Sequence, residues 1–178
     1  FLTGLTFTEV CAVEQTYTKT RKDTAGKRQP VTVDDAFAFL ARFRNGAIGN
    51  LEATRFALGR KNGIQIEING SKGSLFFDFE DMNRLKFYNE GDPADRRGFR
   101  DILVTEGVHP FAGAWWPAGH IIGYEHTFIN GAADILEALG KDNWSGLKPD
   151  FADSAKTQRV LDAAVKSAKS RSWIKTGC

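Results

Sequence analysis

Two kinds of hydrophobic periodicity divide this chain and limit the folds open to it. Up to about residue 105, apolar and polar residues alternate in short segments separated by turn residues, which is typical of β-strands. From Ile121 onward, apolar residues recur every three or four positions, which indicates helices. Strands first and helices afterwards predict an α+β fold, in which a large, open, predominantly antiparallel β-sheet carries helices packed on one face.

A β-hairpin is the clearest element of the strand-rich part. Residues 35–44 place Phe37, Phe39 and Phe43 on one face, and Asn45-Gly46 is a two-residue turn signal before a return strand at 47–57. Further strands are expected at 6–20, with one bulge, and at 64–69, 74–79, 84–89 and 99–105. Residues 19–30 and 90–98 are expected to be exposed loops.

Two amphipathic helices are expected in the last third. The first runs from Ile121 toward a C-cap at Gly140, and its apolar face consists of Tyr124, Phe128, Ala132, Ile135, Leu136 and Leu139. The second begins at Asp150, whose carboxylate can cap it, with Asp153 in its first turn. Its expected buried side consists of Val160, Leu161, Ala164, Val165 and Ala168.

One face of the predicted sheet needs a cover. Residues 36–41 and 75–77 are apolar on both faces, whereas an antiparallel strand with one wet face alternates. The cover could be a preceding part of the protein, another subunit or both. Alternatively, the chain could form a sandwich that buries both faces internally, which the helices of the last third disfavour. We therefore predict that this face is an oligomer interface and that the protein is a homo-oligomer.

Composition excludes several classes of partner. The chain is 42% hydrophobic and 26% charged with a net charge of +2, so we expect neither nucleic acid nor a membrane as partner. No apolar run approaches the roughly 18 residues of a spanning helix. Cys11 and Cys178 lack metal-ligand spacing, and two unpatterned cysteines favour a cytoplasmic location.

A segment rich in aromatic residues and histidines, residues 108–128, leads into the first helix. Aromatic faces stack on the C–H faces of sugars, and imidazole or phenol tips bind hydroxyls. We predict Trp116, His120 and Tyr124 as substrate-binding residues. The alternatives are a space-filling tryptophan, a histidine that tethers the loop and a core tyrosine. Trp115 and Trp116 point in different directions, so at most one can stack on a sugar, and Trp116 is nearer to His120.

Arg55 is the fourth predicted substrate-binding residue. It follows Glu52-Ala-Thr54 in an otherwise apolar strand and could donate to substrate hydroxyls at the edge of the sheet. The alternatives are a salt bridge with Glu52 or a paired core arginine. His109 is expected to be structural, and His126 to face a surface or an interface. No catalytic, cofactor-binding or metal-binding residue is predicted. Gly70–Gly73 lies between strands and is no phosphate loop, no Cys/His cluster has zinc spacing, and Gly70-Ser71 lacks the nucleophile-elbow pattern.

Four segments together resemble one family. They are Asp34-Asp-Ala-Phe…Arg44-Asn-Gly-Ala-Ile-Gly-Asn-Leu-Glu-Ala-Thr-Arg55, Ile66-Glu-Ile-Asn-Gly-Ser-Lys-Gly-Ser-Leu75, Gly119–Phe128 and Pro149–Asp162. They look like the C-terminal domain of the glucose-fructose oxidoreductase/inositol dehydrogenase/rhizopine catabolism (Gfo/Idh/MocA) oxidoreductases. The members that act on sugars such as levoglucosan, or on inositols, look most similar.

The resemblance implies that residues 1–178 are a single C-terminal substrate-binding and oligomerisation domain. The parent would be an NAD(P)-dependent sugar or polyol dehydrogenase. Its N-terminal Rossmann domain, absent from this chain, would bind NAD or NADP and supply a catalytic lysine. A linking helix with an Asp…His pair would end near Phe1–Gly4, which reads like the end of a helix; an ordinary chain start is the alternative.

Two expectations follow for the chain by itself. As a fragment it should be inactive and bind no cofactor, because none of the family's cofactor and catalytic motifs occurs in it. The alternative function is a stand-alone, non-enzymatic module that binds carbohydrate or associates with itself through its β-sheet.

Overall fold

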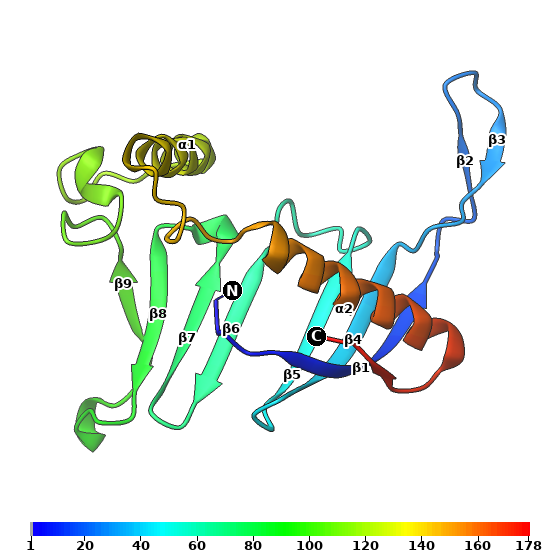
Figure 1. Ribbon diagram of the computed structural model, residues 1–178, viewed down its shortest axis with the longest axis horizontal. Coiled ribbons are helices and arrows are strands. Elements are labelled where there is room, and N and C mark those ends of the chain that lie inside the picture. Colours follow the sequence, from blue (N-terminus) through cyan, green and yellow to red (C-terminus); the bar gives the residue numbers. More distant parts are fainter. Residues whose placement is uncertain (1) are drawn as a thin grey trace. The chain divides into compact units, whose positions relative to one another are not determined.

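The computed structural model describes residues 2–178, and they cluster into two compact units. The first unit extends to Leu58 and resumes at Leu147, and the second spans Gly59–Gly146. All strand pairs among the described residues are antiparallel, and two α-helices accompany them, so the predicted α+β class is confirmed. Figure 1 labels the elements. Hydrogen bonds join the strands into two four-stranded sheets and a separate hairpin.

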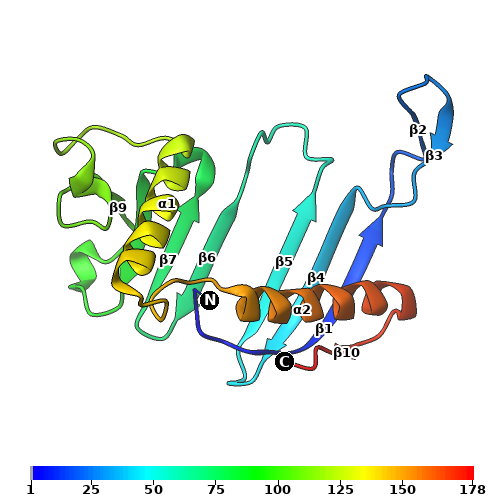
Figure 2. The ribbon, with the colours of Figure 1, turned by 45° about the horizontal axis from the view of Figure 1, so that its top comes forward.

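The sheet of the first unit has the strand order β10-β1-β4-β5. Its strands are β1 (Phe7–Gln15), β4 (Ala36–Phe43), β5 (Ile48–Thr54) and β10 (Ile174–Lys175), the last of which the sequence analysis did not predict. The register between β1 and β4 shifts between Phe7 and Glu9, which confirms the expected bulge. Helix α2 (Phe151–Ser170) lies across this sheet (Figure 2).

The core of the first unit lies between α2 and the sheet. Its buried members are small side chains, namely Val10, Ala12, Ala41, Val160, Ala163 and Ala164. Larger side chains, including Phe37, Phe39 and Phe43, surround this cluster and are only partly buried. Ser167 closes the cluster by accepting the N–H of Ala12 at 2.9 Å and donating to the carbonyl of Ser172 at 2.6 Å.

The Asn45-Gly46 turn confirms the predicted hairpin between β4 and β5. Gly46 has a φ of 87°, a conformation that a glycine adopts without strain. Its N–H donates to the carbonyl of Phe43, and the N–H of Phe43 donates to Ala47.

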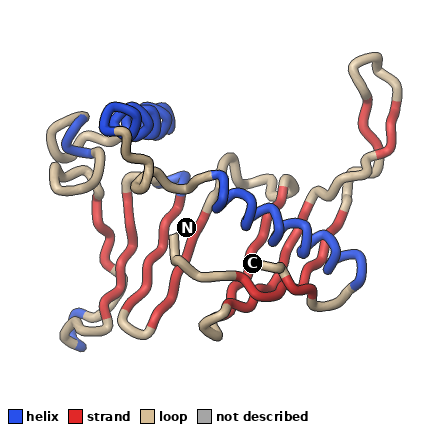
Figure 3. The backbone as a smooth tube through the Cα atoms, in the orientation of Figure 1, coloured by secondary structure: helices blue, strands red, loops and turns tan. Residues whose placement is uncertain are grey.

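A second hairpin corrects the expectation of a loop at 19–30. Strands β2 (Thr20–Lys22) and β3 (Arg28–Pro30) pair in an exposed arm, which Figure 3 shows as a separate pair of strands. The Asp23 carboxylate orders its tip by accepting the N–H groups of Ala25 and Lys27. Polar residues therefore form this ribbon through local hydrogen bonds, which hydrophobic alternation cannot reveal.

The sheet face opposite α2 is partly apolar, as predicted for β4. Leu40 pairs with Cys11 on one side and with Asn50 on the other, so these residues share that face. Its large apolar side chains are exposed: Val13 by 69%, Leu40 by 55% and Ile48 by 82%.

The sheet of the second unit has the order β6-β7-β8-β9. Its strands are β6 (Gln65–Gly70), β7 (Gly73–Asp78), β8 (Arg84–Asn89) and β9 (Arg100–Leu103), close to the predicted ranges. One face carries the row Ile66, Phe77, Leu85 and Ile102, and the other the row Glu67, Phe76, Lys86 and Asp101. Residues 75–77 thus carry apolar side chains on both faces, as predicted, but the cross-strand neighbours of Phe76 on the second face, Glu67 and Lys86, are charged.

Helix α1 (Tyr124–Lys141) starts and ends later than predicted. Its C-cap is Asp142, with a φ of 46°, and Gly140 lies within the last turn. Aspartate tolerates this left-handed conformation better than most residues, so a glycine was not required. Among the described residues of α1, only Ala138 is buried.

Helix α2 begins as predicted. The Asp150 carboxylate accepts the N–H of Asp153 at 2.8 Å. Val160 and Ala164 are buried and Ala168 packs against the core, but Leu161 and Val165 are exposed by 47% and 40%. Within residues 2–178, no helix has both the length and the apolar character needed to cross a bilayer.

The sequence at the start of the chain reads like the end of a helix. Phe1 lies outside the described residues, and Gly4 has a φ of 65°, the conformation expected of a glycine after a helix.

Candidate functional site

The aromatic segment of the second unit is anchored by two buried polar residues. The side chain of Asn83, 9% exposed, both donates to and accepts from the backbone of Ile122, at 2.8 and 3.0 Å. Thr105, 5% exposed, accepts the N–H of Gly119 at 3.1 Å. These bonds fix the loop that carries Trp116 and His120, so its exposed side chains start from a defined backbone.

The adjacent tryptophans have different environments, as predicted. The indole N–H of Trp115 donates to Oδ1 of Asn130 at 2.9 Å, and its ring meets His126 edge to face at 4.4 Å. Trp116 is 52% exposed. Trp115 therefore holds the loop against α1, and Trp116 is the ring that can stack on a ligand.

His120 is tethered to its own loop but keeps one ring nitrogen available. Its Nδ1 lies 2.9 Å from the carbonyl oxygen of Pro117. Because a carbonyl only accepts, Nδ1 carries the proton, and Nε2 of the neutral ring is left as an acceptor. The side chain is exposed, so this nitrogen can accept a hydrogen bond from a hydroxyl group.

Tyr124 is the first residue of α1 and is 56% exposed. Its ring packs edge to face on Phe79 at 5.8 Å and on Phe128 at 5.0 Å. Because α1 begins at Tyr124, His120 lies in the loop ahead of the helix. Within the described residues, no hydrogen bond or ring contact joins Trp116, His120 and Tyr124.

The other histidines support the structure. His109 Nδ1 accepts the N–H of Glu106 at 3.0 Å, consistent with its expected structural role. His126 was expected at a surface or interface, but its side chain is only 14% exposed and its Nδ1 accepts the N–H of Gly123 at the start of α1. A contact of 3.4 Å between Nδ1 and Glu125 is not an ion pair, because that nitrogen carries no proton while it accepts.

Arg55 belongs to the first unit and follows the end of β5. Its side chain is exposed, and among residues 2–178 it forms no ion pair, so the alternative of a bridge to Glu52 does not hold. Its N–H donates to the carbonyl of Asp35 at 2.8 Å. A guanidinium with its donors free is suited to hydroxyl or carboxylate groups.

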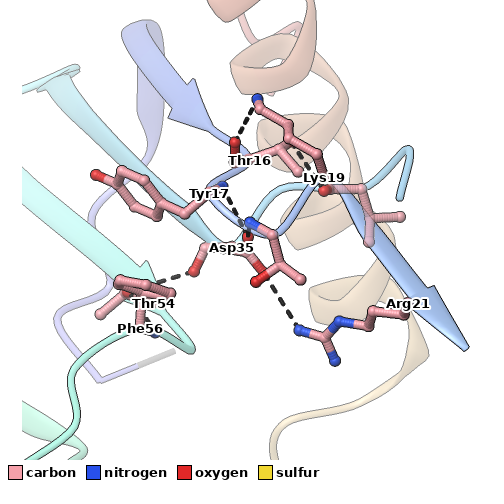
Figure 4. Close-up of polar contacts among 9 residues, drawn as sticks. Thr16, Tyr17, Lys19, Arg21, Asp35, Thr54 and Phe56 are labelled. Carbon is pink, nitrogen blue, oxygen red and sulfur yellow. Dashed lines mark hydrogen bonds and ion pairs between the residues drawn. The ribbon is translucent and has the colours of Figure 1, made fainter. Parts of the chain in front are cut away.

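Asp35 is the functional candidate that the sequence analysis missed. The residue is 5% exposed, and its Oδ2 accepts the N–H groups of Tyr17 and Thr18 at 2.8 and 2.7 Å (Figure 4). These bonds hold the pKa of the Asp35 carboxyl below its usual value, and the bond from the Thr18 N–H contributes most. The guanidinium of Arg21, 3.5 Å from the carboxylate, lowers this pKa further. The feature of the sequence that could have revealed Asp35 is its position directly before an apolar strand.

A groove of about 1090 Å³ lies between α2 and the sheet of the first unit. Phe37, Phe39, Leu51, Leu161 and Val165 give it an apolar floor and wall. Lys148 and Asp153, 3.7 Å apart, lie at the N-terminal end of α2. None of the predicted substrate-binding residues lines this groove.

Neither a metal nor a dinucleotide fits the described residues. Within residues 2–178, no group of three or more His, Cys, Asp or Glu side chains could hold a metal ion. A dinucleotide needs a glycine-rich turn between a strand and a helix N-terminus that receives the pyrophosphate. Helix α2 instead starts with Asp150 and Asp153, and α1 with Glu125, carboxylates that repel a phosphate.

The comparisons with known proteins assign the family. Residues 2–176 match the domain described as "Oxidoreductase family, C-terminal alpha/beta domain". The chain therefore belongs to the Gfo/Idh/MocA oxidoreductase family, as its C-terminal domain, and the predicted family is confirmed.

The particular relatives are sugar dehydrogenases and related oxidoreductases. Over 150 residues, 84% of this chain, it is 41% identical to a levoglucosan dehydrogenase from Pseudarthrobacter phenanthrenivorans, of which it covers 38%. An oxidoreductase domain protein from Kribbella flavida is 49% identical, with a TM-score of 0.92 over 98% of this chain and 47% of its own. A levoglucosan dehydrogenase in complex with NADH and L-sorbose is 39% identical, with a TM-score of 0.88 over 96% of this chain and 45% of its own. The chain thus spans less than half the length of these relatives.

Proposed function

We propose that this chain is the substrate-binding and oligomerisation domain of an NAD-dependent sugar or polyol dehydrogenase. The observation that carries the proposal is its 41% identity to levoglucosan dehydrogenase, together with the structural match to a complex with NADH and L-sorbose. The dinucleotide would bind a preceding Rossmann domain, because the described residues do not fit it. Bound NAD would accept a hydride from a C–OH group of the sugar.

The chain's own contribution would be recognition of the sugar. The exposed ring of Trp116 would stack on a C–H face, and Nε2 of His120 would accept a hydroxyl hydrogen. The hydroxyl of Tyr124, in the same unit, would bind a further hydroxyl group, and the guanidinium of Arg55 is the candidate donor of the first unit. The anchored loop supports the first pair, since Asn83 and Thr105 fix its backbone.

The experiment compares the whole dehydrogenase with this chain. The whole protein should reduce NAD in the presence of levoglucosan, followed by NADH absorbance, whereas the 178-residue chain should be inactive. Calorimetric titration of the chain with NAD or NADP should give no heat of specific binding. Micromolar affinity of the chain for either dinucleotide would contradict the proposal, and so would a whole protein that oxidises no sugar or polyol. Sugar binding by such an inactive protein would support the stand-alone carbohydrate module instead.

The proposed oligomer would form through a sheet face. Exposed Val13, Leu40 and Ile48 support this assignment, because neighbouring apolar side chains of this size usually become covered. Ile48→Glu should shift the sedimentation coefficient toward that of the monomer, whereas Glu67→Ala, on the polar face of the other sheet, should leave it unchanged. A wild-type protein that sediments as a monomer at micromolar concentration would exclude the interface. We place the enzyme in the cytoplasm, which its two free cysteines support.

A further inference from the structure

Asp35 joins three chain segments at one end of the first unit's sheet. Its carboxylate holds the N–H groups of Tyr17 and Thr18, where the chain leaves β1 for the exposed arm. Its own N–H donates to the carbonyl of Gln15 at 2.9 Å. On the other side, its carbonyl accepts the N–H of Arg55 beyond the end of β5.

Thr54 extends this clamp to the next residues. Its hydroxyl lies 3.3 Å from the Asp35 carbonyl, to which it donates, and it accepts the N–H of Phe56 at 3.0 Å. Asp35 and Thr54 thus fix the backbone beyond the ends of β1 and β5, and Figure 4 shows these two residues and their polar contacts.

The result is an exposed aromatic pair at this end of the sheet. The rings of Tyr17 and Phe56 lie 4.7 Å apart with 33° between their planes. They are 52% and 50% exposed, respectively, so the pair is not part of the core. In Figure 4 both rings lie on one side of Asp35, with Arg21 on the other. Exposed ring faces offer a sugar apolar contact, and Arg55, the residue before Phe56, carries hydrogen-bond donors.

We propose that Asp35 is a positioning residue, which holds the exposed Tyr17–Phe56 pair as a sugar-binding edge of the first unit. The inference rests on the proposed function and adds Tyr17 and Phe56 to its contacts. The carboxylate does not reach the sugar itself, because it is almost fully buried and satisfied by two backbone N–H groups. It acts on the Tyr17 backbone, and through the ring contact on Phe56.

The kinetic test uses the whole dehydrogenase with levoglucosan. Asp35→Asn removes the charge that strengthens the two backbone hydrogen bonds, so KM should rise about 10-fold while kcat stays within about 2-fold. Tyr17→Ala should raise KM similarly, and the double variant should be no worse than either single one, because both break the same chain of contacts.

Asp23→Asn is the matched control. Like Asp35, Asp23 accepts two backbone N–H groups, here at the tip of the arm, but it contacts neither Tyr17 nor Phe56 in the described structure. This variant should loosen the tip of the arm and leave KM unchanged.

A second measurement separates the clamp from its role in binding. In the 178-residue chain, Asp35→Asn should accelerate hydrogen exchange at the Tyr17 and Thr18 amides about 10-fold or more. If exchange accelerates while KM stays at the wild-type value, the clamp is purely structural and the positioning role is wrong. If KM rises equally in Asp23→Asn, the effect belongs to the whole arm, and the inference is again wrong. A wild-type enzyme that oxidises no sugar would overturn the proposed function and this inference together.

Discussion

The two helices have similar apolar stripes but different surroundings. On α2, the side chains of Val160, Ala163, Ala164 and Ser167 are buried against the first sheet. On α1, only Ala138 is buried, and Phe128, Leu136 and Leu139 are 63%, 66% and 61% exposed. Periodicity thus identifies which face of a helix is apolar, but not whether this chain provides its cover.

The largest expected effect tests this difference between the two helices directly. Val160→Asp buries an unpaired carboxylate in the core of the first unit and should cost about 4 kcal/mol or more. Leu136→Asp places the same charge on an exposed position of α1 and should cost only about 0.5–1 kcal/mol, mostly through helix propensity. Thermal unfolding of the 178-residue chain measures both. Equal losses would mean that the α1 stripe is covered in solution.

The adjacent tryptophans provide the next comparison. Trp115→Ala removes the bond to Asn130 and the packing on His126, so it should lower stability by about 2–3 kcal/mol. Trp116→Ala and His120→Ala should change stability by less than about 1 kcal/mol. In the whole enzyme, Trp116→Ala and His120→Ala should each lower kcat/KM by about 5- to 150-fold, the equivalent of about 1–3 kcal/mol.

Sugar kinetics and thermal melting distinguish these roles. His109→Ala is a useful control, because it removes only the acceptor for the Glu106 N–H. Full kcat/KM in both Trp116→Ala and His120→Ala, across several sugars and inositols, would show that the segment is only structural.

Local signals predicted much of the fold. The Asn45-Gly46 turn, the Asp150 cap and strand β8 were all predicted where the structure has them. Each depends on neighbouring residues: a turn dipeptide, a capping carboxylate or strict alternation. The family, too, was predicted from short motifs and is confirmed.

The errors share a physical cause. Arm β2–β3 and strand β10 are held by polar or distant partners, such as Asp23 and β1, which periodicity does not register. Asp35 was missed because its role depends on strand ends that are far apart in the sequence. The site residues Arg55, Trp116, His120 and Tyr124 remain predictions, and their exposure fits sugar binding because exposed side chains can take their partners from a substrate.

The smallest expected effect compares one clamping carboxylate from each unit. Asp35 in the first unit and Glu80 in the second each accept two backbone N–H groups, those of Tyr17 and Thr18 and those of Lys61 and Asn62. These bonds lower both pKa values below the ordinary 3.8 and 4.5. A lowered pKa in the folded state means that the unfolded chain binds the proton more tightly.

Each carboxylate therefore contributes stability that is complete above its ordinary pKa and is lost as the pH falls below that value. Asp35→Asn and Glu80→Gln should each flatten the fall in unfolding free energy between about pH 6 and pH 3, measured by urea denaturation. The flattening should be greater for Asp35, whose side chain is 5% exposed, than for Glu80, at 30%, because solvent screens the more exposed group. A steeper acid dependence in either variant would reverse the sign and show that the carboxylate is stabilised in its protonated form.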